Sequence, residues 1–181
     1  MNKYSLSVRE LNETDLNLIT GYWLKANDAF LRSMGVDITK MPAREEWIKM
    51  LAEQLSQSFE EKKSYCIIWQ ADDKPVGHSN VNKIKFGEEA YMHLHLWNTD
   101  VRQKGIGTQL VKMTLPLFFE NLKLQKLYCE PYSLNRAPNK VVEKAGFTFV
   151  KELITTPGWL NFEQPVNLWE LTHDNYRKII I

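Results

Sequence analysis

The sequence has little cysteine, no long apolar run and almost no excess of charge. Its 181 residues include 23 Lys and Arg against 22 Asp and Glu, so the net charge is +1. Proteins that act as nucleic-acid scaffolds normally carry a marked basic excess, so we expect no nucleic-acid partner. No apolar run approaches the length that crosses a bilayer, and the first ten residues lack an apolar signal-peptide core. We therefore expect no membrane association and a cytoplasmic location.

Cysteine occurs only at Cys66 and Cys129, each inside a strand-like stretch and not in a metal-like spacing. Two buried thiols are favoured over a disulfide. The apolar share of 44% and the charged share of 25% are those of a folded globular protein. The length predicts a single domain over residues 1–181.

Hydrophobic periodicity predicts the order of helices and strands. Apolar residues at steps of three and four predict four helices, over about 16–30, 43–59, 106–118 and 137–145. Alternating or short apolar runs predict seven strands, at 5–11, 64–71, 76–86, 90–97, 126–130, 147–155 and 166–172. Three strands in succession indicate an antiparallel meander, and the following strand, helix and strand form a crossover that makes two strands parallel. The predicted fold class is therefore α/β (α+β): a mixed sheet of about seven strands, mostly antiparallel, with about four helices.

The segment RQKGIG, residues 102–107, joins a predicted strand to a predicted helix. Backbone N–H groups at a helix start are unpaired and favour an anion such as phosphate. Gly105 and Gly107 let a ligand approach the backbone, and Arg102 and Lys104 add positive charge. The segment lacks the third glycine of a dinucleotide fingerprint and the Gly-Lys-Ser/Thr of a nucleotide-hydrolase loop. By itself it is equally compatible with a tight turn that carries surface charges.

Two motifs together resemble the GNAT superfamily of acetyl-CoA-dependent N-acetyltransferases. The signature Arg/Gln-x-x-Gly-x-Gly is met by Arg102, Gly105 and Gly107, and Asn135 with the segment 143–147 (EKAGF) is similar to the second signature. The predicted order of elements fits the family along essentially the whole chain. The second signature looks most like the branch that includes ribosomal-protein N-terminal alanine acetyltransferases.

The resemblance implies that acetyl-CoA is the cosubstrate, without a metal, and implies which residues hold it. The implied cofactor-binding residues are Leu96, Trp97, Arg102, Gln103, Lys104, Gly105, Ile106, Gly107, Thr108 and Asn135. Leu96 and Trp97 would line the pantetheine arm, and the turn from Arg102 to Thr108 would hold the pyrophosphate. The sequence departs from the family at two places. Val142 stands where many members have a tyrosine that acts as general acid, and Pro138 stands where the related branch often has serine or alanine. The general acid is thus unassigned, with Tyr132 as the candidate.

His93 and His95 are the predicted general bases, in that order of preference, because an acceptor amine must lose a proton and histidine is suited to take it. Some arylalkylamine acetyltransferases of the superfamily have a histidine at the place of His93. The preceding strand presents His78, Asn80 and Asn82 on one face. A hairpin that pairs residues whose numbers sum to an odd value gathers all five side chains on one face, and an even sum separates them. The sequence leaves this register open.

Other interpretations of the histidines stay open as well. Each histidine has the alternative of being a hydrogen-bonded core residue. The His-x-His pair also allows zinc, although no third ligand stands at a diagnostic spacing. The predicted activity is direct transfer of an acetyl group from acetyl-CoA to a primary amine, either of a small molecule or of a peptide N-terminus. The alternatives are a noncatalytic acyl-CoA sensor and, more weakly, a metal-dependent hydrolase. The sequence does not name the amine, and a homodimer is compatible with it.

Overall fold

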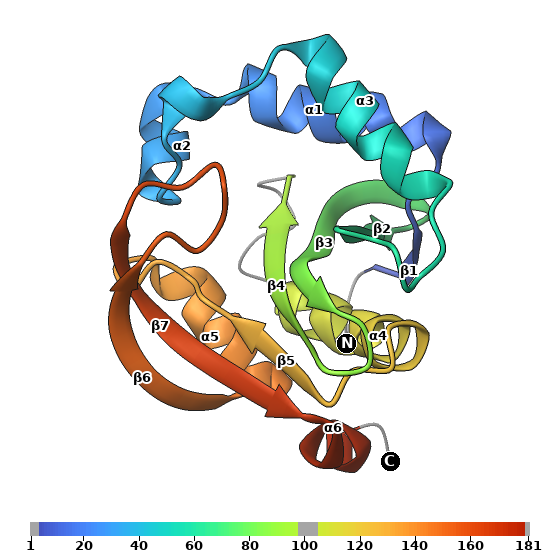
Figure 1. Ribbon diagram of the computed structural model, residues 1–181, viewed down its shortest axis with the longest axis vertical. Coiled ribbons are helices and arrows are strands. Elements are labelled where there is room, and N and C mark those ends of the chain that lie inside the picture. Colours follow the sequence, from blue (N-terminus) through green and yellow to red (C-terminus); the bar gives the residue numbers. More distant parts are fainter. Residues whose placement is uncertain (1–3, 98–104, 180–181) are drawn as a thin grey trace.

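The computed structural model describes residues 4–97 and 105–179. A seven-stranded sheet with the order β1-β2-β3-β4-β5-β7-β6 lies at its centre (Figure 1). The strands are β1 (Leu6–Glu10), β2 (Tyr65–Ala71), β3 (Lys74–Lys85), β4 (Glu89–Leu96), β5 (Lys126–Cys129), β6 (Thr148–Thr155) and β7 (Gln164–Thr172). Strands β4 and β5 pair in parallel, and every other neighbouring pair is antiparallel. This confirms the predicted mixed sheet with one crossover.

Six α-helices accompany the sheet in the described part of the chain. They are α1 (Leu16–Lys25), α2 (Asp28–Ser33), α3 (Arg44–Leu55), α4 (Ile106–Asn121), α5 (Arg136–Ala145) and α6 (His173–Ile179). The helix predicted over 16–30 is two helices, because Ala26 is extended and the Asn27 side chain caps α2 by accepting from the backbone N–H of Phe30 at 2.9 Å. The short α6 directly follows β7 and was not predicted. No helix among the residues described has the length and apolar character needed to cross a membrane.

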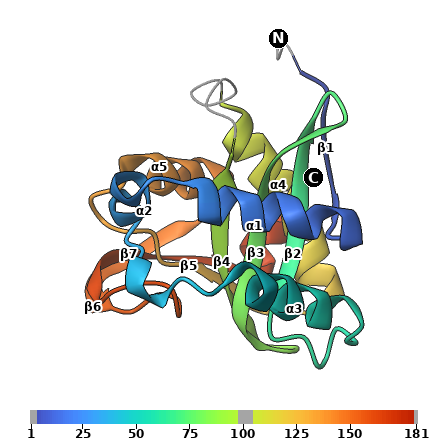
Figure 2. The same ribbon diagram turned by 90° about the horizontal axis from the view of Figure 1, so that it is seen from above.

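The helices cover the two faces of the sheet and create two cores (Figure 2). On one face, α4 packs its buried side against β2, β3 and β4 through residues such as Leu110, Phe118 and Trp69. On the other face, α1 and α3 pack against β2 through Ile19, Trp23, Trp47, Cys66 and Ile68. Cys66 and Cys129 are both buried and free, which confirms the predicted thiols. The sheet thus separates an α4 side from an α1/α3 side.

Strands β4 and β5 diverge beyond their last pair, Met92 with Cys129 (Figure 1). The chain after β5 turns to β7 instead: Tyr132 forms a bridge with Val166, and the backbone N–H of Ser133 donates to Pro165 at 2.9 Å. Beyond Met92, strand β4 continues to Leu96 paired with β3 but no longer with β5. The parallel pair therefore opens into a gap in the middle of the sheet, with β4 on one side and residues 130–135 on the other.

Candidate functional site

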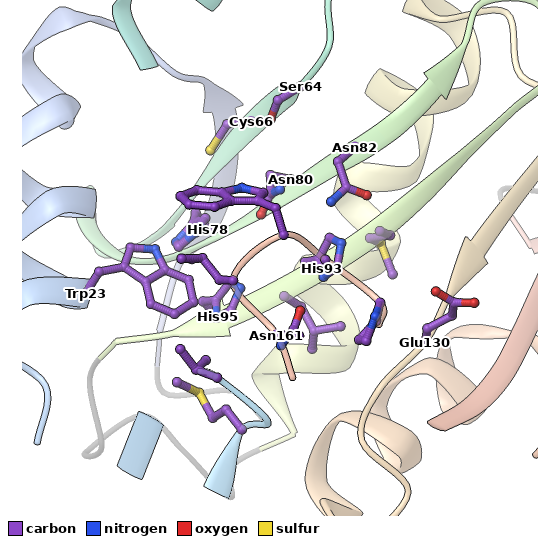
Figure 3. Close-up of a pocket in the computed structure, with 18 of the residues that line it drawn as sticks. Trp23, Ser64, Cys66, His78, Asn80, Asn82, His93, His95, Glu130 and Asn161 are labelled. Carbon is purple, nitrogen blue, oxygen red and sulfur yellow. The ribbon is translucent and has the colours of Figure 1, made fainter. Parts of the chain in front are cut away.

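The β3–β4 hairpin pairs residues whose numbers sum to an odd value. His78 lies opposite His95, and Asn80 lies opposite His93. Asn82 is two residues further along β3, so all five side chains share the α1/α3 face of the sheet. Figure 3 shows these side chains projecting toward the same space. The pairing thus decides the alternative that the sequence left open.

A cavity of about 450 Å³ adjoins this polar face. All five hairpin residues line it, and so do Met92 and Leu94, whose side chains lie on the opposite face of β4. The cavity therefore reaches the place where β4 and β5 diverge, where Met92 and Cys129 also line it. Its other walls come from the helical layer, from the segment after β5 and from the β6–β7 loop with the start of β7. The helical layer contributes Ile19, Trp23, Val36, Trp47 and Leu51, and the segment after β5 contributes Glu130, Tyr132 and Asn135. The β6–β7 loop and the start of β7 contribute Pro157, Gly158, Trp159, Leu160, Asn161 and Gln164.

His78 and His95 form a stacked pair deep in the cavity wall. Their ring centroids are 4.7 Å apart, and the indole N–H of Trp97 donates to Nδ1 of His78 at 2.8 Å. The hydroxyl of Tyr22 lies 3.4 Å from Nδ1 of His95. Burial lowers the pKa of His78 to about 3, with a smaller contribution from His93, and burial also lowers the pKa of His95 well below its ordinary value. Both rings are therefore neutral at neutral pH and act as packed, hydrogen-bonding groups.

The Nε2 atom of His93 is buried and has no hydrogen-bond partner among the described residues. Burial lowers the pKa of His93 to about 4, and the positive charge of Lys83 adds to the effect. The backbone of His93 is held in place, since the Ser79 hydroxyl donates to its carbonyl at 2.8 Å. A neutral imidazole with an unpaired nitrogen can accept a proton from, or donate one to, a group that enters the cavity.

Unpaired buried polar atoms concentrate around this cavity. Five such side-chain atoms occur among the described residues, and four of them belong to residues that line it: Trp47 Nε1, Asn82 Oδ1, His93 Nε2 and Gln164 Oε1. Buried polar groups in proteins are nearly always hydrogen-bonded, because an unpaired one costs about 1–3 kcal/mol. The grouping of four unpaired atoms in one cavity indicates a place for a polar ligand.

The β6–β7 loop, residues 156–163, is fastened to the turn after α2. Gly35 presents its carbonyl to the side-chain amides of Asn161 at 2.9 Å and Gln164 at 3.1 Å, and the backbone N–H of Asp37 donates to Leu160 at 2.8 Å. Gly35 has φ +81°, and a Cβ there would lie 1.9 Å from the Gln164 side chain. Only glycine fits at this point. The loop therefore lies against α2 (Figure 1), and its residues 157–161 line the cavity.

The start of α4 has the features expected of a phosphate site. Gly105 has φ +73° and open space where a Cβ would stand, and no side-chain hydrogen bond caps the helix. The first N–H groups of α4, at Ile106, Gly107 and Thr108, are thus not capped by a side chain of the described residues. A Cβ on Gly107 would only reach ordinary contact with Val141, at 3.6 Å. These residues fit a bound pyrophosphate. Arg102, Gln103 and Lys104 lie outside the described residues.

The other residues implied for the cofactor and the acid lie in different surroundings. Tyr132 and Asn135 line the cavity from the segment after β5, with Tyr132 packed edge-on against Phe162 at 6.2 Å. Leu96 packs against the α4-side core, whereas Trp97 is turned to the α1/α3 side through its hydrogen bond to His78. The two side chains predicted to line the pantetheine arm therefore lie on opposite faces of the sheet. Their roles, and those of Tyr132 and Asn135, stay predictions.

Two further residues, Glu130 and Val142, can be located in the structure. Glu130 forms an ion pair with Lys83 at 3.4 Å at the edge of the cavity. Val142 is fully buried in α5, so no hydroxyl is present at the position of the family tyrosine. In residues 4–97 and 105–179, no group of three or more His, Cys, Asp or Glu side chains is arranged to hold a metal ion.

Several lining residues escaped prediction from the sequence. Trp23, Trp47 and Trp159 were not predicted as site residues, yet all three line the cavity, and Trp159 is 49% exposed. Gln164 and Gly158 carried no motif. The one signal was the proline and glycine content of the β6–β7 loop, which marks a loop without saying what it packs against.

Comparison with known proteins adds to this geometry. Residues 5–148 match the family described as "Acetyltransferase (GNAT) domain". No curated protein matches the sequence. Among solved structures, RimL, a ribosomal L7/L12 alpha-N-protein acetyltransferase in complex with coenzyme A, is 18% identical with a TM-score of 0.76, covering 94% of this chain and 96% of that one.

Two further solved structures are similar over nearly the full length. Spermidine N-acetyltransferase from Vibrio cholerae, in complex with coenzyme A and spermine, is 17% identical with a TM-score of 0.76, covering 95% of this chain and 98% of that one. Aminoglycoside acetyltransferase AAC(6')-Ib in complex with coenzyme A is 16% identical with a TM-score of 0.73, covering 98% and 100%. At these identities the likeness establishes a shared fold.

Proposed function

This chain belongs to the GNAT acetyltransferase family, and from that membership we propose that it is an N-acetyltransferase that moves the acetyl group of acetyl-CoA directly to a primary amine. The observation that carries the proposal is the continuous cavity, which joins the gap between β4 and β5 to the face that presents His93. An acyl donor on the α4 side and an amine on the α1/α3 side would meet in this gap. Residues 1–181 would act as one domain, and we place it in the cytoplasm.

We assign the phosphates of acetyl-CoA to the start of α4. Gly105 leaves room for the ligand, and the N–H groups of the first turn, including that of Gly107, provide donors. Arg102 and Lys104 would add charge, and Gln103 lies between them in sequence. Leu96, Trp97 and Asn135 are retained as candidate contacts of the arm. Acetyl-CoA supplies the activated acetyl group when bound.

His93 is the proposed general base, because it lines the cavity and its buried Nε2 has no hydrogen-bond partner among the described residues, whereas His78 and His95 stack on each other. Its lowered pKa, about 4, keeps it neutral and able to accept a proton at neutral pH. It is too weak a base to deprotonate a free ammonium of pKa about 10. It suffices for an amine nitrogen that has begun to form the new C–N bond, since that nitrogen is far more acidic. His95 is the second candidate, and Tyr132 the candidate acid toward the leaving thiolate.

We propose that a backbone donor on β4 stabilises the developing oxyanion. The N–H of Trp97 donates to Val76 of β3 at 2.8 Å, so by the alternation of an antiparallel ladder the odd-numbered residues of β4 direct their backbone N–H groups toward β3. The backbone N–H of Leu94 consequently points toward the gap beyond the last β4–β5 pair. A donor aimed at this point is worth about 3–4 kcal/mol in comparable acyl transfers.

The test is release of the free thiol from acetyl-CoA by the purified protein, with a panel of amines and peptide N-termini and an amine-free blank. We expect release that depends on the amine and an acetylated product detected by mass spectrometry. Acetyl-CoA binding measured by calorimetry in parallel separates the enzyme from the sensor alternative. Tight binding with no product from any acceptor would reject the transferase and favour an acyl-CoA sensor.

A further inference from the structure

The walls of the acceptor side of the cavity are aromatic. Trp23 and Trp47 stack with their ring centroids 5.9 Å apart, and Trp47 meets Trp159 at 5.6 Å. Trp23 also contacts His95 edge-on at 4.8 Å. Trp159 is about half exposed although it is a large apolar side chain, and it stands where the cavity meets solvent. These rings form a continuous band beside the histidine face, which we call the tryptophan wall: Trp23, Trp47 and Trp159.

Negative charge is nearly absent from the same cavity. Among the described lining residues only Glu53 and Glu130 are acidic, and each lies within reach of a lysine: Lys49 at 4.0 Å and Lys83 at 3.4 Å. Lys63 also lines the cavity and adds a positive charge. A ligand with several ammonium groups needs carboxylates to replace its water, because an unpaired charge is costly to bury. The cavity offers no such set.

Two polar atoms at the cavity that lack hydrogen-bond partners could together bind one amine group. Asn82 Oδ1 and His93 Nε2 are unpaired, and both side chains lie beside Gly158: a Cβ there would be 3.6 Å from the His93 ring and 3.8 Å from the Asn82 amide nitrogen. These acceptor atoms and the tryptophan wall therefore lie close to each other, because Trp159 directly follows Gly158 in the β6–β7 loop. The hydrogen bonds from the Asn161 and Gln164 side chains to the Gly35 carbonyl hold this loop in place.

From this juxtaposition we infer that the acceptor is a small molecule with a single primary amine on an aromatic or similarly flat apolar body, and is neither a polyamine nor an aminoglycoside. The inference rests on the proposed N-acetyltransferase function. In the reaction, the amine nitrogen forms a bond to the acetyl carbon, the thioester C–S bond breaks, the amine loses one proton and the thiol of coenzyme A is released. The aromatic body stacks on the tryptophan wall, while Asn82 and His93 meet the amine.

The experiment measures kcat/KM at saturating acetyl-CoA for 2-phenylethylamine, n-hexylamine, ethylamine, spermidine, kanamycin and a short peptide with an N-terminal Phe. We expect 2-phenylethylamine to exceed n-hexylamine by at least about threefold, the value of one aromatic contact. It should exceed spermidine and kanamycin by at least about a hundredfold, since these bury unpaired charges. Equal or faster acetylation of spermidine, kanamycin or the peptide would overturn the inference.

A matched pair of variants tests the wall itself. Trp159→Ala should lower kcat/KM for 2-phenylethylamine by about tenfold more than kcat/KM for ethylamine, because only 2-phenylethylamine has a flat ring to stack on the wall. Phe149→Ala is the control: Phe149 is 50% exposed, nearly the same as Trp159, but lies on β6 and does not line the cavity. The Phe149→Ala variant should change kcat/KM for neither amine. An equal decrease of kcat/KM for both amines in Trp159→Ala would contradict the assignment of the tryptophan wall to the aromatic body.

Failure of the inference and failure of the proposed function give different results. Turnover of ethylamine without any preference for 2-phenylethylamine would overturn the inference alone. Calorimetric titration of 2-phenylethylamine and spermidine in the presence of coenzyme A covers the case in which no amine is acetylated. Preferential binding of 2-phenylethylamine would then support the ligand class while rejecting the transferase, and preferential binding of spermidine would reject both.

Discussion

The buried histidines should make the fold sensitive to mild acid, and His78 provides the clearest test. Its side chain is 3% exposed, and burial lowers its pKa from 6.5 to about 3. Between these two values the unfolded chain binds a proton at this histidine and the folded chain does not. Stability from this group is therefore complete above the unfolded pKa of about 6.5 and is lost as the pH falls toward the folded pKa.

The magnitude follows from the two pKa values. At pH 5, protonation of a histidine with pKa about 6.5 lowers the free energy of the unfolded chain by about 2 kcal/mol, while the folded state gains almost nothing. His93, with a pKa lowered to about 4, adds a similar amount, and the pKa of His95 moves in the same direction. His78 and His93 together then remove about 4 kcal/mol at pH 5, out of the roughly 5–15 kcal/mol that stabilises a typical domain, and His95 acts in the same direction.

The assay is urea unfolding followed by tryptophan fluorescence at pH 7.5 and pH 5.0, for the wild type and for His78→Asn. Asparagine keeps an acceptor for the indole N–H of Trp97 but does not titrate. We expect the variant to lose about 2 kcal/mol less than the wild type between the two pH values. His173→Asn, in α6, controls for replacement of a histidine outside the cluster. If His78→Asn loses as much stability as the wild type, the reasoning from burial is refuted.

Three further predictions concern the site. His93→Ala should lower kcat by about 10²–10⁴-fold with acetyl-CoA affinity unchanged in calorimetry, and unaltered turnover would remove His93 as the base. Gly158→Ala places a Cβ 2.8 Å from the Asn161 side chain and 3.6 Å from the His93 ring, so steady-state kinetics should show a higher KM for the amine with acetyl-CoA binding unchanged; an unchanged amine KM would mean that the loop adjusts freely. The pair Arg102→Glu and Lys104→Glu should weaken acetyl-CoA binding by at least about tenfold, as expected for loss of charge-assisted phosphate contacts; wild-type affinity in calorimetry would reject the anion site.

Much of the architecture followed from local sequence. The seven strands and the crossover were predictable because each strand has its own alternating or apolar run and each main helix its own periodicity. The division of the segment 16–30 into α1 and α2 was not predicted, because the capping by Asn27 is a single side-chain contact that a periodic pattern does not reveal. Local pattern thus predicted which elements exist better than where each one ends.

For the site as well, some features could be predicted from local sequence and others could not. Gly105 and Gly107 lie close together in the sequence, so the phosphate site could be predicted there without any knowledge of the fold. The hairpin register was beyond reach, because the same alternation of polar and apolar residues fits an odd or an even pairing, and only packing of one face against α1 and α3 selects the odd one. The polar cluster of His78, Asn80 and His93 therefore depended on tertiary structure.

The sequence by itself determined the family, the order of elements and the acyl donor, since those reside in contiguous motifs. Only the tertiary structure decided that one histidine has an unpaired nitrogen in the cavity while the other two are stacked and hydrogen-bonded. It alone also brought Trp23, Trp47 and Trp159 together from three distant segments. The physical reason is that burial, desolvation and side-chain contact are properties of neighbours in space, and those neighbours lie on elements that the chain joins only through folding.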